Sequence, residues 1–139
     1  MAEARRLDGW EVRLYQTVDA ARVRPYRMGE NDWLSLACEV VKTLTGVEHW
    51  SALAGRYSTT PEGMALMRAE YAQDFDDAIS LLFGRAPVTI ERAQRGDLVK
   101  YLDGQDPHLC VCLGIDSVLL AASGMRVLPT RQGEKVWKV

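Results

Sequence analysis

Residues 26–46 contain the feature that most constrains the fold, a glycine-containing turn followed directly by an amphipathic segment. Apolar residues recur in helical steps of three and four along one face of this segment: Leu34, Ala37, Val41 and Leu44. Asn31 or Asp32 can accept hydrogen bonds from the free N–H groups of a first helical turn. Gly46 follows where a left-handed residue ends a helix. The pattern therefore predicts a helix over about 32–45.

Trp33 occupies the first position inside this predicted helix. The N-terminus of a helix carries partial positive charge, which lowers the pKa of a thiol placed there. Cysteine hydrolases put their nucleophile at such a position for this reason. An indole is no nucleophile, so Trp33 argues against this chemistry. Its two interpretations, an ordinary core aromatic and a plug in a former active-site cleft, both imply no catalysis.

The rest of the N-terminal half predicts further helices. Four segments are indicated by apolar spacing, caps or stop signals: residues 7–23, 47–54, a helix that starts at Thr60-Pro61, and about 74–83. Thr60 is expected as the cap of its helix, with Pro61 as the first helical residue. Three side chains of these segments are expected in the core: Trp50, Met64 and Met67.

The C-terminal half predicts strands. Five short apolar segments are separated by turn signals: residues 97–102, 108–115, 118–122, 125–128 and 136–139. Such short strands with tight turns predict an antiparallel meander. Helices followed by strands are typical of an α+β protein. We expect one domain over 1–139, with a helical part at about 7–84 and a sheet part at about 96–139.

Charge and composition argue against several classes of partner. The 139 residues carry a net charge of −2 and the arginines are scattered, so we expect no nucleic-acid partner. The start lacks the apolar run of a signal peptide, and the longest apolar run, 117–122, is too short to cross a bilayer. We therefore expect synthesis in a cytoplasm and no membrane insertion. No phosphate-cradling glycine loop occurs, so no cofactor and no small-molecule substrate are expected.

The sequence predicts neither a disulfide framework nor a metal site. The three cysteines are an odd and sparse set, better interpreted as structural thiols: Cys38, Cys110 and Cys112. His108 is the only third ligand near the last two, which is too few for a metal site. An acidic first turn is expected to be solvated and to complement a helix dipole rather than hold a cation, and it comprises Asp74, Asp76 and Asp77.

Three segments share the order of a known catalytic pattern: Asp32-Trp33, Gly-Asp-Leu-Val at 96–99, and His-Leu-Cys-Val-Cys-Leu-Gly at 108–114. They resemble NlpC-type cysteine peptidases and amidases, a papain-like α+β family. That family has Asp-Cys at a helix start, Gly-Asp before the first strand and a histidine opening the second. The resemblance implies a papain-like fold, with Trp33 at the nucleophile position and His108 at the general-base position.

Six segments occur in a second characteristic order along the chain: residues 28–32, 45–48, 57–59, 95–99, 110–114 and 136–139. Their order and spacing resemble a family of small proteins from the tail gene clusters of tailed phages and prophages. This resemblance implies a structural component of a siphophage-type tail tip or baseplate, located in the virion tail and bound to other tail proteins. The alternatives are an active peptidoglycan amidase or peptidase of the tail tip, and a cytoplasmic tail-assembly factor.

The catalytic set implied by the first resemblance is incomplete. The next strand should provide a polar side chain to orient the histidine, but residues 118–122 are all apolar, so His108 alone remains of the triad. Cys38 and Ser35 lie on other faces of the helix than its first residue. Cys110 shares the strand parity of His108 and stays open as a relocated nucleophile. The alternative for His108 itself is a partly exposed turn residue.

The final segment, 136–139, has two interpretations. It can be a closing edge strand whose Trp137 packs on the sheet. It can instead dock onto a neighbouring protein through Trp137 and Val139, because an edge strand offers unpaired backbone groups for strand addition.

Overall fold

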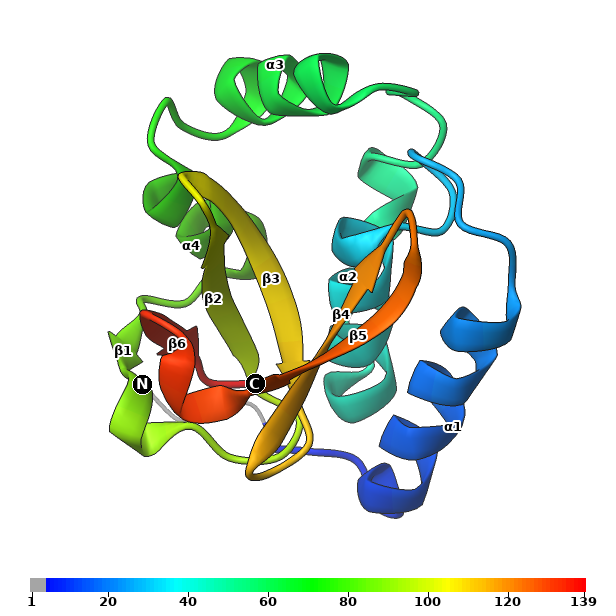
Figure 1. Ribbon diagram of the computed structural model, residues 1–139, viewed down its shortest axis with the longest axis vertical. Helices are drawn as coiled ribbons and strands as arrows, with labels where there is room; N and C mark the ends of the chain where they lie inside the picture. The colour runs from blue at the N-terminus through cyan, green and yellow to red at the C-terminus, as the bar shows by residue number, and fades with distance from the viewer. Residues whose placement is uncertain (1–4) are drawn as a thin grey trace.

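Four helices precede a six-stranded antiparallel sheet in the computed structural model, which describes residues 5–139 (Figure 1). The expected α+β class is therefore confirmed, whereas expectations about residues 1–4 lie outside the described residues. The helices are α1 Trp10–Val23, α2 Trp33–Thr45, α3 Thr60–Glu70 and α4 Phe75–Phe83. The strands are β1 Val88–Thr89, β2 Leu98–Asp103, β3 Asp106–Cys112, β4 Asp116–Ala121, β5 Gly124–Pro129 and β6 Lys135–Trp137. Three short 3-10 turns complete the order: η1 Trp50–Ala52, η2 Ile90–Arg92 and η3 Thr130–Gln132.

Helix α2 is the centre of the helical layer. Eight of its 13 residues are buried, because α1 covers one side of it and the sheet covers another. The core that it shares with α1 contains three buried residues of that helix: Leu14, Val18 and Ala21. Gly46 ends α2 in the left-handed region, at φ 81°, as predicted.

Asn31 and Asp32 are adjacent in the chain and stabilise the ends of two different helices. The side-chain amide of Asn31 donates to three main-chain oxygens at and just after the end of α1, those of Ala21, Arg24 and Pro25, at 3.1, 3.2 and 3.3 Å. The bond to Ala21 satisfies a carbonyl that the helix itself leaves free. Asp32 forms a capping box at the start of α2: its carboxylate accepts from the Ser35 N–H at 2.8 Å, and its own N–H donates to Ser35 Oγ at 2.9 Å.

Two expectations about helices are wrong. Residues 47–54 form no α-helix, only the three-residue 3-10 helix η1, because a segment this short gains too few bonds to offset helix nucleation. Helix α3 is capped by Thr59 rather than Thr60: the Thr59 side chain accepts from the Glu62 N–H at 3.3 Å, and Pro61 becomes the second helical residue. The start of α4 agrees with the sequence, since Asp74 caps it.

The sheet follows the predicted meander from β2 to β5, but β6 does not continue it. The strand order is β1-β6-β2-β3-β4-β5, so β6 returns to the far side of β2. Trp137 pairs with Leu98 of β2, and Val136 pairs with Val88 of β1. The expected closing edge strand is therefore an interior strand, and the short β1 was not predicted. The edges of the sheet are β1 and β5.

The two faces of the sheet bury different clusters. The face under the helices contributes Leu98, Leu109, Val111, Val118, Leu120 and Trp137. The opposite face contributes Val99, Cys110, Cys112, Leu119, Leu128 and Val136, with Val88, Ile90 and Ala93 packed against them. Because its central strands are buried on both sides, their sequences are apolar runs rather than alternating patterns.

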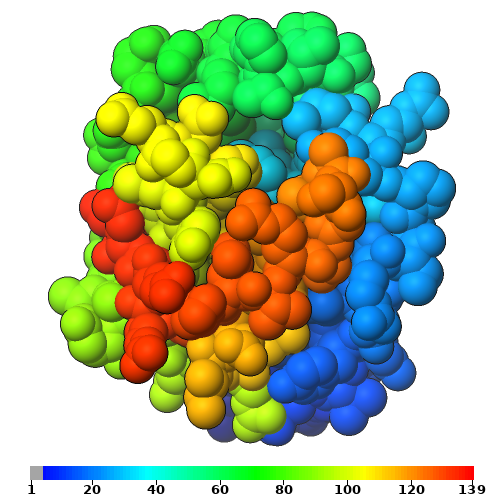
Figure 2. All heavy atoms as spheres, viewed as in Figure 1, coloured from blue at the N-terminus to red at the C-terminus, as the bar shows by residue number. Residues whose placement is uncertain are grey.

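Strands β3 and β4 separate as they leave their connecting turn. They pair at Val111↔Val118 and Cys112↔Ser117, next to the turn, and then diverge (Figure 1). The space-filling view shows a hollow between the yellow β2–β3 hairpin and the orange β5, with cyan atoms of α2 beneath it (Figure 2). The start of α2 is thus close to β3, where the candidate site lies.

Candidate functional site

Trp33 and His108 are brought into contact by the fold. Their ring centroids lie 6.0 Å apart and the ring planes meet at 72°, an edge-on arrangement. Trp33 is the first residue of α2, and His108 lies on β3 opposite Tyr101 of β2. Both side chains are half-buried. The two positions that the resemblance assigns to nucleophile and general base are therefore neighbours in space.

The indole of Trp33 fills the space between α2, α4 and β3. Besides His108 it contacts Phe75, the first residue of α4, with ring centroids 6.0 Å apart and planes at 52°. It packs against both hydrophobic clusters of the protein. Aromatic pairs in such tilted and edge-on arrangements are favourable beyond the area that they bury. Trp33 therefore occupies space that a cysteine side chain would leave largely empty.

His108 has no side-chain partner that would orient its ring. Its Nδ1 lies 3.0 Å from the main-chain oxygen of Asp106, and no side chain among residues 5–139 forms a hydrogen bond with the imidazole. It belongs to β3 rather than to a turn, although it is partly exposed as expected. On β4, three residues after Ser117 are buried and apolar: Val118, Leu119 and Leu120.

The cysteines are poor candidates for a relocated nucleophile. Cys110 is 1% exposed and lies in the cluster with Val99 and Leu119. Its burial raises its pKa to about 12, so it remains a neutral thiol near pH 7. Burial likewise raises the pKa of Cys38. The hydroxyl of Ser35 is used in the capping box.

A buried carboxylate holds the turn before α2 in place. Asp32 is 1% exposed and accepts three hydrogen bonds, from the Gly29 N–H at 2.8 Å, the Ser35 N–H at 2.8 Å and the Tyr57 hydroxyl at 2.6 Å. Burial, followed by the charge of Asp32, raises the pKa of Tyr57, so its hydroxyl stays a donor. Gly29 has φ +86°, and a Cβ there would lie 2.0 Å from the Tyr57 main-chain oxygen. Residues 28–32 and 57–59, two of the segments that carry the resemblance to tail proteins, therefore form one structural unit.

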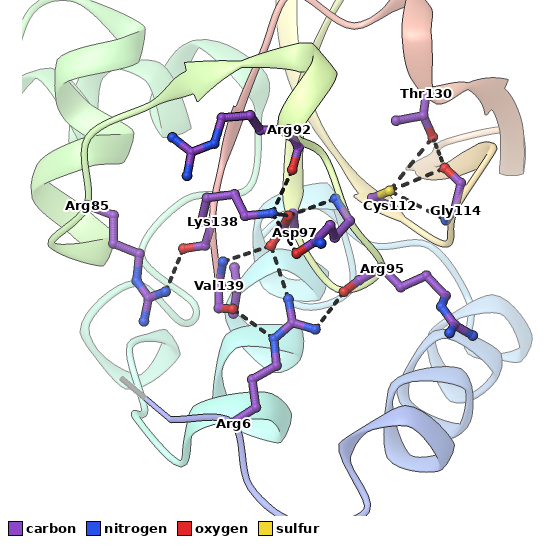
Figure 3. A network of polar contacts seen from close by, with 11 residues as sticks. Arg6, Arg85, Arg92, Arg95, Asp97, Cys112, Gly114, Thr130, Lys138 and Val139 are labelled. Carbon is purple, nitrogen blue, oxygen red and sulfur yellow. Dashed lines mark hydrogen bonds and ion pairs between the residues drawn. The ribbon is translucent and has the colours of Figure 1, made fainter. Parts of the chain in front are cut away.

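A second buried carboxylate, Asp97, holds both ends of the described chain (Figure 3). Its Oδ1 accepts from Arg6 at 3.1 Å and from the Val139 N–H at 2.9 Å. Its Oδ2 accepts from the Gln94 N–H at 2.9 Å and from Lys138 Nζ. Asp97 is 0% exposed, so these donors replace the water that it loses. The Gly-Asp before β2 therefore has a structural role.

Trp137 and Val139 are not available as an exposed interface. Trp137 is 0% exposed and its Nε1 donates to Ser80 Oγ at 3.0 Å, while Val139 is 9% exposed. Of the two interpretations of the final segment, packing of Trp137 on the sheet is confirmed. Docking of these side chains onto a neighbour is contradicted, because β6 pairs on both sides.

The acidic turn of α4 is only partly solvated, which corrects the sequence expectation. Asp76 forms ion pairs with Lys100 at 2.8 Å and Lys135 at 2.5 Å. Burial alone would raise the pKa of Asp76, but its hydrogen bonds to the two lysines outweigh burial and lower it. Asp77 stays exposed. Within residues 5–139, no group of three or more His, Cys, Asp or Glu side chains is arranged to hold a metal ion.

The expected core residues of the middle segment lie nearer the surface than predicted. Met64 and Met67 are half-buried and line a cavity under α3, and Met67 also packs against the core. Trp50 is also half-buried and meets Tyr57 edge-on, with ring centroids 6.3 Å apart. The helical spacing of Met64 and Met67 predicts a buried face, but spacing alone does not distinguish a face in the core from the wall of a cavity.

The protein is thus an α+β domain in which Trp33, the first residue of α2, packs beside His108 on β3. The chain belongs to the family described as Domain of unknown function (DUF6950), whose model matches residues 5–139. A search of curated proteins found no match. No helix in the part of the chain that the structure describes is long and apolar enough to cross a membrane.

Proposed function

We propose that the chain is a papain-like, NlpC-type domain without hydrolase activity, and that it serves as a structural component of a siphophage-type tail tip or baseplate. One observation carries this proposal: the indole of Trp33 occupies the first position of α2 and lies against His108, 6.0 Å between ring centroids. In the peptidases that the chain resembles, the nucleophile stands at this position. The domain would then act by binding neighbouring tail proteins.

The chemistry of the site supports a loss of catalysis. Acyl transfer by such enzymes needs a nucleophile, a base and a group that orients the base. Trp33 provides no nucleophile, and His108 has no orienting side chain among the described residues. Cys110 is protonated and buried. Asp32 is fully engaged by three donors. A fold retained without its catalytic set is best explained by a binding role.

The structural role can be tested by measuring which proteins purified tails contain. Tails would be isolated from lysate, washed at high salt and analysed by quantitative mass spectrometry. A structural component stays at a fixed ratio to other tail proteins, because a stable contact that buries about 1,200–2,000 Å² survives such a wash. Absence from mature tails, with the chain free in the lysate, would reject the structural role and favour a cytoplasmic assembly factor.

A further inference from the structure

A small apolar cavity lies under α3, beside the start of α2. Its volume is about 60 Å³. A cavity needs at least about 10–15 Å³ to hold one water, so this cavity has room for a small aliphatic group such as a leucine side chain. Its apolar walls include Met28, Trp33, Met64, Met67 and Phe75.

Helix α3 forms an adaptable roof over this cavity. None of its residues is buried. Gly63 allows a close approach to Tyr57, since a Cβ there would lie 3.1 Å from the Tyr57 ring, and an ion pair joins Glu70 to Arg56 below. The methionines of the walls have flexible side chains that repack around different apolar groups. The methionine side chains can therefore repack around a ligand, while the contact at Gly63 and the Glu70–Arg56 ion pair hold α3 in place.

Arg68 gives the cavity a preference for negative charge. It lies on α3, lines the cavity and is exposed. It forms no ion pair with any of residues 5–139. The only acid in the lining, Asp32, is 1% exposed and already bound by three donors. A ligand that places a carboxylate beside its apolar group would meet a free guanidinium.

We propose that this cavity binds a leucine-sized apolar group with an adjacent carboxylate. The apolar group enters between Met28, Met64 and Met67, and the carboxylate pairs with Arg68 at the rim. The same chemistry occurs in a short-chain carboxylic acid and in a leucine–glutamate segment of another protein. This binding site goes beyond the proposed role in a tail, because the cavity is present whether or not the chain is catalytic.

Methionine methyl NMR tests the site directly. The chain with 13C-methyl methionine would be titrated with hexanoate and with uncharged 1-hexanol, then with acetyl-Gly-Leu-Glu-Gly-amide and its Gln counterpart. We expect shifts of the Met28, Met64 and Met67 methyls, with Met125 on β5 unchanged as an internal control. In each pair the carboxylate ligand should bind more tightly. If hexanoate binds more tightly than the peptide, the ligand is a free carboxylic acid. If the peptide binds more tightly, the ligand is a segment of another protein.

Three variants separate the cavity from general surface binding. Arg68→Gln should weaken hexanoate roughly two- to fivefold, the range of an exposed ion pair, and leave 1-hexanol unchanged. Arg131→Gln, an exposed arginine of η3, is the matched control and should change neither. Ala72→Leu should fill the cavity and abolish binding of both. Absence of shifts at the three methyls, or equal affinity for acid and alcohol, would overturn the proposal.

Discussion

The indole of Trp33 and the imidazole of His108 meet edge-on, with ring centroids 6.0 Å apart and planes at 72°. One ring belongs to the first residue of α2 and the other lies on β3. Under the proposed function these are the positions of the nucleophile and the general base, and here the two side chains pack against each other. Phe75 of α4 completes the cluster. The half-buried Trp33 therefore packs against the hydrophobic core at this point of the fold.

Removal of the indole should destabilise the protein. Trp33→Ala is expected to lower the free energy of unfolding by about 3 kcal/mol, the lower end of the range for Trp→Ala because Trp33 is half-buried. Trp33→Phe, which keeps a ring in the cluster, should cost clearly less. Urea denaturation of the three proteins measures both effects. If Trp33→Ala were as stable as the parent, the indole would be better interpreted as a binding anchor, a common role of tryptophan in interfaces.

Gly29 should tolerate no side chain. Its φ is +86° and a Cβ would lie 2.0 Å from the Tyr57 main-chain oxygen, so Gly29→Ala must displace the segment that holds Asp32. Gly104→Ala is a matched control, since Gly104 has φ +64° but nothing within 4 Å of a Cβ. The control should cost about 1–2 kcal/mol for the left-handed conformation, and Gly29→Ala should cost more. Equal melting temperatures of the two variants would contradict the close contact.

Asp97 should be essential for stability rather than for chemistry. Asp97→Asn removes the charge that Arg6 and Lys138 share, and a broken buried ion pair typically costs 3–5 kcal/mol. We expect about 3 kcal/mol, because both cations reach solvent. Glu91→Gln, at an exposed acid nearby in the chain, should have little effect. Thermal unfolding compares them, and a loss at Asp97 no larger than at Glu91 would show that the network contributes nothing.

The ion pairs of Asp76 should make stability depend on pH in acid. The pKa of Asp76 is lowered below its ordinary value of 3.8, so its stabilisation is fully present above that value and is lost as pH falls through the lowered pKa. Asp76→Asn should therefore be less stable than the parent near pH 6, and the difference should shrink below about pH 4. The exposed Asp77→Asn serves as control. A difference that stays constant from pH 6 to 2 would contradict this assignment.

Helix α2, the centre of the helical layer, could be predicted because its signals lie close together in the sequence. The cap at Asp32, the apolar spacing of the following helix and the stop at Gly46 all act within a few residues of one another, and the observed α2 agrees with them. The α+β class follows from the same kind of signal. The contact of Trp33 with His108 was expected only through the resemblance, because nothing in either segment alone brings a helix start beside a strand.

The features that the sequence does not predict depend on contacts between residues that are distant in the chain. The interior position of β6 depends on its pairing with β1 and β2, which no turn signal near Trp137 encodes. Arg6 and Asp97 are 91 residues apart, so the network around that carboxylate was not foreseen. Asp76 looked like a solvated acid because Lys100 and Lys135 lie on strands that the sequence does not place opposite α4.

Assay of peptidoglycan cleavage distinguishes a domain without hydrolase activity from an active enzyme. Purified chain, His108→Ala and Trp33→Cys would each be incubated with muropeptides, and the products separated by liquid chromatography with mass detection. We expect no products from any of the three, because even a cysteine at the helix start would lack an orienting group beside His108. Robust turnover by the parent that disappears in His108→Ala would reject the loss of catalysis and identify the chain as an active peptidase or amidase.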